Sequence, residues 1–204
     1  CLRDAHTVEC DDGTRLQARH IVIATGSQAL KPELPGAELG GVSDDFFAMQ
    51  AAPARVAIVG GGMAGLALGA SLAHQGVQAP LFDRAPPGFE GPWATTARME
   101  TLRSPKELTG PALGLASLTF RAWFEAQFGL EAWTALDKIP RLQWADYLRW
   151  YRQVLGLDVR NLQRVVSVRP RSDGVAQLDM ADDADGGRAY TVLARHVVLA
   201  TGRD

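Results

Sequence analysis

Residues 56–84 read VAIVGGGMAGLALGASLAHQGVQAPLFDR, a stretch with the pattern of a strand, a helix and a second strand. It opens with an uncharged run rich in β-branched residues, residues 56–60, and the pattern of residues 55–60 is typical of a central parallel strand. Apolar residues then recur at helical spacing from Met63 to Gln75, with Gly76 as the stop signal. Val77 to Phe82 reads as a second strand. We therefore expect a strand–helix–strand unit with parallel strands, which opens an α/β domain.

The turn between the first strand and the helix has the glycine spacing of a dinucleotide-binding fingerprint. Gly60 permits a tight turn, Gly62 lets the backbone approach a pyrophosphate, and Gly65 lets helix and strand pack closely. The start of the helix supplies free N–H groups and the positive end of its dipole to two phosphates. The alternative is a glycine-rich packing turn without a ligand. The expected cofactor-binding residues of the turn are Gly60, Gly61, Gly62, Met63, Ala64 and Gly65.

A carboxylate follows the second strand. Asp83 lies eighteen residues beyond Gly65, where it is placed to accept hydrogen bonds from an adenosine ribose. Arg84 would suit the 2′-phosphate of NADP, but Asp83 would repel that phosphate. We therefore expect Arg84 to be a solvated charge or one on the pyrophosphate side.

One phrase occurs twice. Residues 18–27 read ARHIVIATGS and residues 194–203 read ARHVVLATGR, with a single glycine fingerprint between them. A nucleotide site takes one such closing strand beside its glycine turn, so the first copy is surplus. Residues 7–26 predict a hairpin around an Asp-Gly turn that leads into a buried strand, and a Pro- and Gly-rich linker follows. The expected boundaries are residues 1–53 for this piece and 54–204 for the nucleotide-binding domain.

The rest of the chain predicts a helical insertion and a β-meander. A long loop-rich stretch follows Asp83, and Thr119 is placed to cap a helix that ends at Gly129. The run QWADYLRWYRQVL, residues 143–155, places four large apolar side chains on one helical face. Strand-like runs continue from Leu157 to the closing phrase. The expected fold class is α/β: a Rossmann-like, three-layer FAD/NAD(P)-binding domain with a parallel sheet, a helical insertion and a hairpin or meander.

Composition excludes several classes of protein. The chain has 204 residues, 47% of them hydrophobic, and a formal net charge of −2. That charge argues against a nucleic-acid or anionic-membrane partner, and the five glycines of residues 56–73 argue against a membrane span. Cys1 and Cys10 fit neither a redox pair nor a zinc site, so we expect no metal. The start CLRDAH has no signal-peptide order, so we expect a cytoplasmic chain that looks cut.

Residues 54–204 resemble the class B flavin-dependent monooxygenases, in the group of the amino-acid N-hydroxylases and FAD-dependent urate hydroxylases. The matching phrases are GGGMAGLALGASLA, GPWATTARMETLRSPKELTGP, LTFRAWFEAQFG, KIPRLQWADYLRWYRQVL and HVVLATGRD. The resemblance implies that the glycine turn and Asp83 hold FAD, and that Ala200, Thr201 and Gly202 close the site. It also implies that Trp93 lies near the flavin and Lys106 near substrate or NADPH; a core tryptophan and a surface lysine are the alternatives.

Residues 1–62 resemble the glutathione-disulfide reductases instead, through DDGTRLQARHIVIATGS, PELPGAELGGVSDDFF and ARVAIVGGG. This resemblance implies that residues 1–53 are the C-terminal piece of a flavoprotein FAD domain plus a linker, with Thr25 and Gly26 at the flavin. The chain departs from that family after residue 62, and it lacks the paired active-site cysteines.

The two resemblances meet at the glycine turn. We hypothesise a truncated or chimeric chain with a join near residues 60–63. The expected function is the FAD-binding portion of a monooxygenase that uses NADPH or NADH and a small-molecule substrate. The flavin would carry the redox chemistry, so no catalytic residue is assigned. The alternatives are a disulfide reductase of the glutathione reductase type and a non-catalytic nucleotide-binding fragment.

Overall fold

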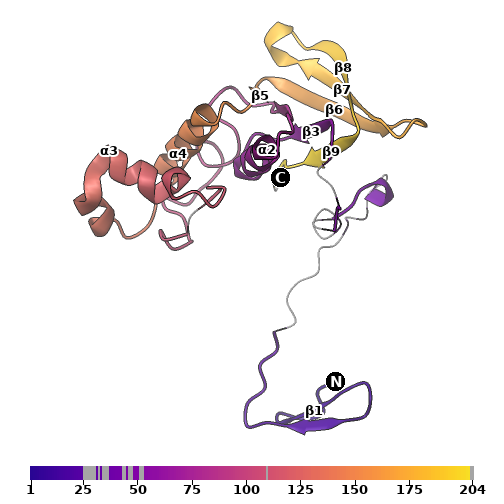
Figure 1. The fold of residues 1–204 in the computed structure, drawn as a ribbon, viewed down its shortest axis with the longest axis vertical. Coiled ribbons are helices and arrows are strands. Elements are labelled where there is room, and N and C mark those ends of the chain that lie inside the picture. The colour runs from indigo at the N-terminus through magenta and orange to yellow at the C-terminus, as the bar shows by residue number, and fades with distance from the viewer. Residues whose placement is uncertain are drawn as a thin grey trace. The chain divides into compact units, whose positions relative to one another are not determined.

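A computed structural model of the chain describes residues 1–24, 31, 33, 37–42, 45, 48–50, 53–108 and 110–202 (Figure 1). The chain divides into two compact units, Cys1–Met49 and Gln50–Asp204. Within the described residues, no helix has both the length and the apolarity that crossing a membrane requires.

The first unit contains the predicted hairpin. Strands β1 (Thr7–Glu9) and β2 (Arg15–Gln17) pair antiparallel, and Gly13 takes a positive φ of 83° in the turn between them. A three-residue 3-10 helix, η1, covers Ala37–Leu39.

The buried strand predicted after this hairpin is wrong for residues 21–24, which form no strand. Val22 and Ile23 are 85% and 67% exposed. A strand needs a partner and a face to bury, and the described part of this unit offers only a hairpin of three-residue strands. Thr25 and Gly26 lie outside the described residues.

The second unit is built on a parallel sheet with strand order β5-β4-β3-β9. Its members are β3 (Val56–Val59), β4 (Leu81–Phe82), β5 (Val159–Arg160) and β9 (His196–Leu199). The register pairs Ile58 with Leu81 on one side and with Val198 on the other. The predicted α/β fold with a parallel sheet is confirmed, although the second strand is shorter than the predicted residues 77–82.

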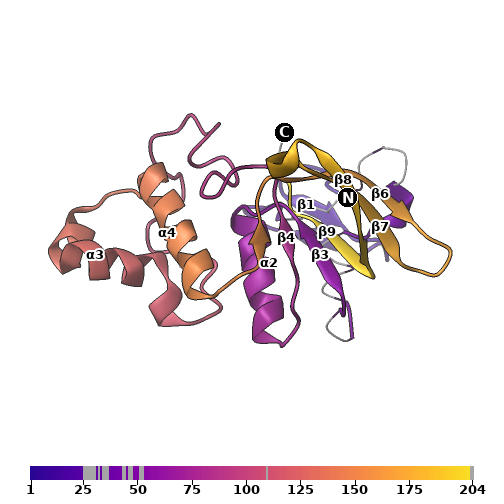
Figure 2. The same cartoon turned by 90° about the horizontal axis from the view of Figure 1, so that it is seen from above.

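Both faces of this sheet are covered, which gives the expected three layers (Figure 2). Helix α2 (Met63–His74) packs on one face, where Val56 and Ile58 point into the larger core cluster. Ala57 and Val59 point to the opposite face, against an antiparallel meander. The meander consists of β6 (Gln163–Pro170), β7 (Ala176–Asp182) and β8 (Arg188–Ala194), with the 3-10 helix η3 (Asp183–Asp185) between the last two strands.

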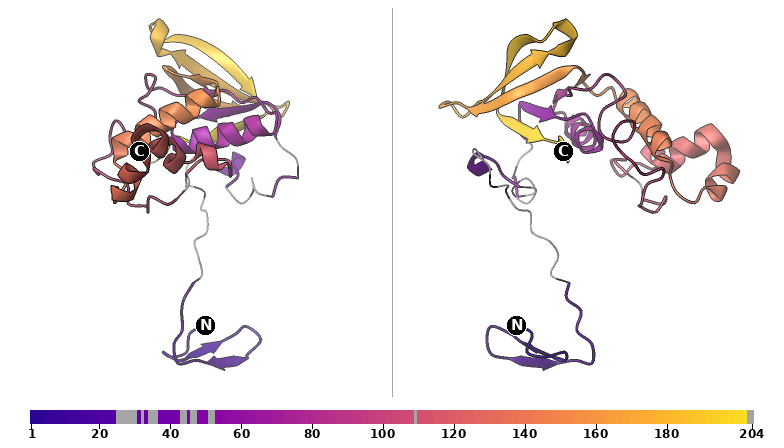
Figure 3. Two further views of the ribbon diagram at one scale, coloured as in Figure 1. Left: turned by 60° about the vertical axis from the view of Figure 1, so that its left-hand side comes forward. Right: turned by 180° about the vertical axis from the view of Figure 1, so that it is seen from behind.

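The helical insertion lies beyond α2, on the side away from the meander, as the views in Figure 3 show. It contains the 3-10 helix η2 (Ala116–Leu118), then α3 (Phe120–Ala135) and α4 (Arg141–Val154). Thr119 caps α3 by accepting a 3.2 Å hydrogen bond from Ala122 N–H, as its position predicts. Gly129 was expected to end this helix; instead it kinks the helix at φ 86° and a further helical stretch follows, because glycine adopts positive φ without strain.

The predicted aromatic face of α4 forms the core of the insertion. Trp144, Tyr147, Leu148 and Tyr151 are all buried. The Tyr147 ring meets the Phe120 ring of α3 edge-on, with 5.5 Å between centroids. The insertion is therefore well packed, and its aromatic residues belong to the same core cluster as β3 and α2.

Candidate functional site

The turn between β3 and α2 depends on its first and third glycines for packing. Gly60 has a φ of 112° and donates its N–H to the Phe82 carbonyl at 2.8 Å. A Cβ atom at Gly60 would overlap the carbonyl oxygen of Ala200, and one at Gly65 would overlap the carbonyl oxygen of Gly60. Both positions therefore require glycine so that strand, helix and β9 can approach one another.

Gly62 has a different environment. Its φ of −72° suits any residue, and a Cβ there would lie 3.5 Å from the Cα atom of Gly91, an ordinary contact. Gly62 is the N-cap of α2, and no side chain caps this helix end. Met63 and Ala64 are exposed beside it. The positive end of the helix dipole thus faces a surface free of side-chain caps.

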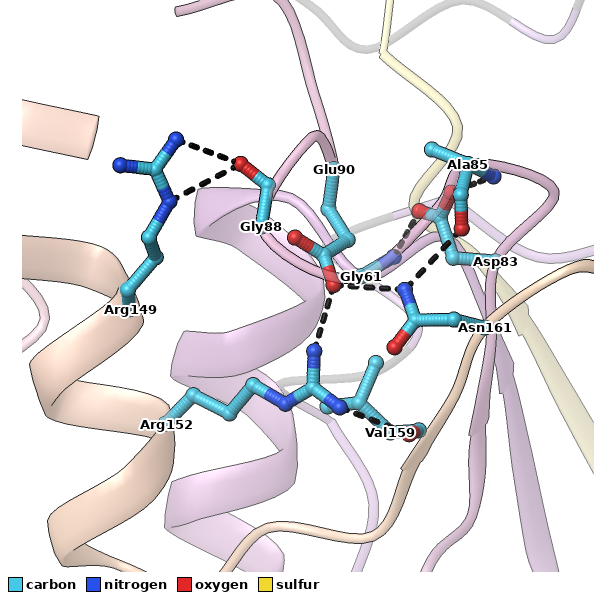
Figure 4. A network of polar contacts seen from close by, with 9 residues as sticks. All are labelled: Gly61, Asp83, Ala85, Gly88, Glu90, Arg149, Arg152, Val159 and Asn161. Atoms are coloured by element: carbon cyan, nitrogen blue, oxygen red, sulfur yellow. Dashed lines mark hydrogen bonds and ion pairs between the residues drawn. The ribbon is translucent and has the colours of Figure 1, made fainter. Parts of the chain in front are cut away.

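Asp83 lies at the end of β4 and faces this turn (Figure 4). Its Oδ2 atom accepts a hydrogen bond from Gly61 N–H at 2.6 Å, and Oδ1 accepts one from Ala85 N–H at 2.8 Å. An ionised carboxylate has about four lone-pair sites, so both oxygens can accept further bonds from a ligand. The neighbouring Arg84 is exposed.

The loop that follows, residues 85–93, is held by arginines of α4. Arg149 donates two hydrogen bonds to the Gly88 carbonyl, at 3.0 and 2.8 Å, and Arg141 donates one to the Trp93 carbonyl at 2.6 Å. Trp93 is half-buried and meets Trp144 edge-on at 6.4 Å between centroids. Trp93 thus takes part in the packing between the loop and α4.

Glu90 is the buried charge of this loop, with a side chain only 9% exposed. Its Oε1 atom accepts from Arg152 Nη1 at 2.5 Å and from Asn161 Nδ2 at 2.6 Å (Figure 4). Arg152 also donates to the Val159 carbonyl at 2.9 Å. Sequence reasoning missed this group because Arg152 and Asn161 follow Glu90 by 62 and 71 residues, which leaves no local spacing to read.

The end of β9 lies beside the glycine turn, as predicted. The Ala200 N–H donates to the Val59 carbonyl at 2.7 Å, and Ala200 is half-buried. Thr201 and Gly202 are exposed, and Gly202 has a φ of 81°.

Lys106 is engaged at the end of α3. Its Nζ atom donates to the Trp133 carbonyl at 2.8 Å and to the Leu136 carbonyl at 2.5 Å, and it lies 4.9 Å from the centroid of the Trp133 ring. The side chain therefore caps the carbonyl end of a helix, a placement that cations favour. It is half-buried rather than the surface lysine of the alternative.

These features together fit the pyrophosphate and ribose of a dinucleotide. The uncapped end of α2 offers N–H groups to phosphate, and Asp83 offers acceptors to ribose hydroxyls. Within the described ranges, no group of three or more His, Cys, Asp or Glu residues could hold a metal ion. The fold and this site define a dinucleotide-binding domain.

Comparison with known proteins agrees with that class. Residues 57–204 match the FAD-NAD(P)-binding family, and the chain belongs to this family. Residues 1–102 match the pyridine nucleotide-disulphide oxidoreductase family. The two matches overlap over residues 57–102, which contain the glycine turn, Asp83 and Glu90.

Individual relatives match different parts of the chain. A FAD-dependent urate hydroxylase of Xanthomonas campestris is 49% identical over 149 residues, which are 72% of this chain and 30% of that protein. A glutathione reductase of Yarrowia lipolytica is 52% identical over 63 residues, 30% of this chain and 13% of that protein. A FAD-bound cadaverine monooxygenase of Erwinia amylovora has the same fold, with a TM-score of 0.61 at 18% identity over 74% of this chain and 36% of that chain. The chain thus spans about a third or less of these proteins.

Proposed function

We propose that this chain is the FAD-binding portion of a flavin-dependent, NAD(P)H-using monooxygenase that hydroxylates a small molecule. The observation that carries the proposal is the uncapped N-terminus of α2 behind Gly62, flanked by the Asp83 carboxylate and the end of β9. The 49% identity to a FAD-dependent urate hydroxylase over 149 residues supports FAD as the nucleotide.

In this proposal the residues of the turn bind the pyrophosphate through backbone N–H groups, and Asp83 binds the ribose. Arg84 is a charge on the pyrophosphate side, and Trp93 lies toward the flavin. The closing strand completes the site from the other side. The proposed cofactor-binding residues are Gly60, Gly61, Gly62, Met63, Ala64, Gly65, Asp83, Arg84, Trp93, Ala200, Thr201 and Gly202.

The protein would contribute binding, orientation and exclusion of water. Bound FAD supplies the reaction with O₂ once NAD(P)H has reduced it. The glycine turn fixes the nucleotide end, and the loop of residues 85–93, held by α4, shields that end from solvent. We also place the chain in the cytoplasm, a location with which its two free, exposed cysteines agree.

A disulfide reductase is the second candidate, and the match of residues 1–102 to the disulphide oxidoreductase family favours it. Both candidates use FAD and NAD(P)H, but only a monooxygenase couples NAD(P)H oxidation to O₂. The domain division at residues 53/54 is likewise proposed, with residues 1–53 as a piece of a second flavoprotein FAD domain.

The test is to titrate the purified chain with FAD, NADP⁺ and NAD⁺ and to identify the nucleotide released when the chain is denatured. We expect saturable binding of FAD and release of FAD alone. Tight NADP⁺ binding without any flavin would reverse the assignment.

A further inference from the structure

Arg152 connects α4 with the neighbouring strand β5 and with a loop that is distant in sequence. It lies in the last turn of α4, and its guanidinium contacts Glu90 of the loop and the Val159 carbonyl of β5. The Arg152 side chain is 25% exposed and that of Glu90 is 9% exposed. A charge this buried is costly unless it is paired, so the two side chains depend on each other.

The Glu90 carboxylate lies close to the nucleotide end of the site. A Cβ atom at Gly61 would lie 3.2 Å from Glu90 Cγ, so the acidic side chain packs against the glycine turn itself. Gly91, the residue after Glu90, lies beside Gly62: a Cβ atom at Gly62 would be 3.5 Å from the Cα atom of Gly91. The turn therefore has two carboxylates beside it, Glu90 and Asp83.

A dinucleotide brings a doubly charged pyrophosphate to this same turn. An unpaired Glu90 would repel it, because like charges that are close together and partly shielded from water repel each other strongly. Arg152 removes that repulsion and Asn161 satisfies the carboxylate further. Arg149, three residues earlier on α4, is paired instead with Asp146 and with the Gly88 carbonyl.

We propose that Arg152 is a positioning residue for dinucleotide binding: it neutralises Glu90 and fixes the loop of residues 88–91 against the glycine turn. The inference rests on the proposed FAD site. It assigns to α4, a helix of the insertion, control over nucleotide affinity.

The test is the dissociation constant of FAD for the full chain, measured by flavin fluorescence at low and high salt. For Arg152→Gln we expect about tenfold weaker binding or more at low salt, partly recovered at high salt because salt screens the repulsion. Arg152→Lys keeps the positive charge, and we expect it to bind within about threefold of the wild type. Glu90→Gln removes the repelling group, and Glu90→Gln combined with Arg152→Gln should recover most of the affinity.

Arg164→Gln is the matched control, because Arg164 lies on β6 of the meander and forms its ion pair with Asp183 of η3. It should leave FAD affinity unchanged. If Arg152→Gln does not fold, the FAD dissociation constants of Arg152→Lys and Glu90→Gln are compared instead. Neither of these variants leaves a buried negative charge unpaired.

Equal, salt-independent losses in Arg152→Gln and Glu90→Gln would overturn the inference and show a merely structural contact. So would an Arg152→Lys variant that binds about tenfold more weakly than the wild type. A wild-type chain that binds NADP⁺ but no FAD would instead overturn the proposed function, and this inference with it.

Discussion

Gly62 is the glycine of the turn that the protein itself does not need. Its backbone suits any residue and a Cβ there makes an ordinary contact, whereas Gly60 and Gly65 have no room for one. The sequence could predict all three positions because the fingerprint is local. It also predicted their roles, but not the distant residues that lie beside them, Ala200 at Gly60 and Gly91 at Gly62.

This difference predicts opposite outcomes for two alanine variants. Gly62→Ala should keep the free energy of unfolding within about 1 kcal/mol of the wild type and weaken FAD binding about tenfold or more, because its methyl group occupies the path of the pyrophosphate. Gly65→Ala should lose about 3 kcal/mol of stability, since the overlap is with backbone. Urea unfolding and FAD titration measure both; a Gly62→Ala variant with wild-type affinity would contradict the assignment.

In the part of the chain that the structure describes, helix α4 has two buried tyrosine hydroxyls, one with a hydrogen-bond partner and one without. Tyr147 donates its hydroxyl to the Leu118 carbonyl at 2.7 Å, whereas the buried Tyr151 hydroxyl has no partner among the described residues. Helical spacing predicts that both side chains are buried, as they are. It does not predict their hydrogen bonds, because those depend on a segment about thirty residues earlier in the chain.

Phenylalanine variants of these two residues should therefore have different effects on the free energy of unfolding. Tyr147→Phe leaves the Leu118 carbonyl without this donor and should cost about 1 kcal/mol of unfolding free energy. Tyr151→Phe removes a buried hydroxyl without a partner and should be neutral or stabilising by up to about 1 kcal/mol. Thermal or urea unfolding at neutral pH gives the comparison; a Tyr151→Phe variant less stable than Tyr147→Phe would contradict the hydrogen bonding of α4.

Burial of the same side chains predicts an alkaline limit to stability. Burial raises the pKa of Tyr151 to about 12, and burial together with the charge of Tyr151 raises the pKa of Tyr147. The folded state thus holds these protons more tightly than the unfolded state, whose tyrosines titrate near pH 10. The stabilisation is complete below pH 10 and is lost as the pH rises toward 12.

We expect the free energy of unfolding to fall between pH 10 and 12 and to fall less steeply in Tyr151→Phe. Urea unfolding at a series of alkaline pH values measures both slopes. Equal slopes in the variant and the wild type would show that the tyrosine does not contribute.

For the whole molecule, the sequence predicted the structure that follows from local patterns better than it predicted long-range contacts. The strand–turn–helix of residues 56–74 and the parallel partner β9 follow from spacing and apolar runs. Residues 20–23 read HIVI, close to the HVVL of β9, yet they form no strand. A strand needs a partner and a face to bury, and the described part of the first unit offers only the two-stranded sheet of β1 and β2. The sequence did not predict the Glu90–Arg152 ion pair either, because this pair joins a loop to a helix that is distant in sequence.

Residues 18–27 and 194–203 are two copies of one phrase, and only the second is expected at the nucleotide site. Matched variants in the two copies should therefore differ in FAD affinity. Thr25→Ala and Gly26→Ala should leave FAD affinity unchanged, whereas Thr201→Ala and Gly202→Ala should weaken it, and Gly202 has the positive φ that makes alanine unfavourable. A chain of residues 50–204 should keep the affinity of the full chain. FAD titration tests each; equal losses in both copies would place the first copy in the working site.

We propose that two flavoproteins are joined at the glycine turn, which lies within residues 57–102, where the two family matches overlap. The coding DNA on both sides tests this directly. Flanks that continue two different flavoproteins are expected, and a continuous reading frame of one family on both sides would contradict it.

We propose that one FAD binds with its pyrophosphate at the N-terminus of α2. A crystal structure of the chain with bound FAD would show where the nucleotide lies. We expect the pyrophosphate within hydrogen-bond distance of the backbone N–H groups of residues 62–64, and the ribose at Asp83. Density for FAD at any other place, or for NADP⁺ at this turn with FAD excluded, would contradict the account.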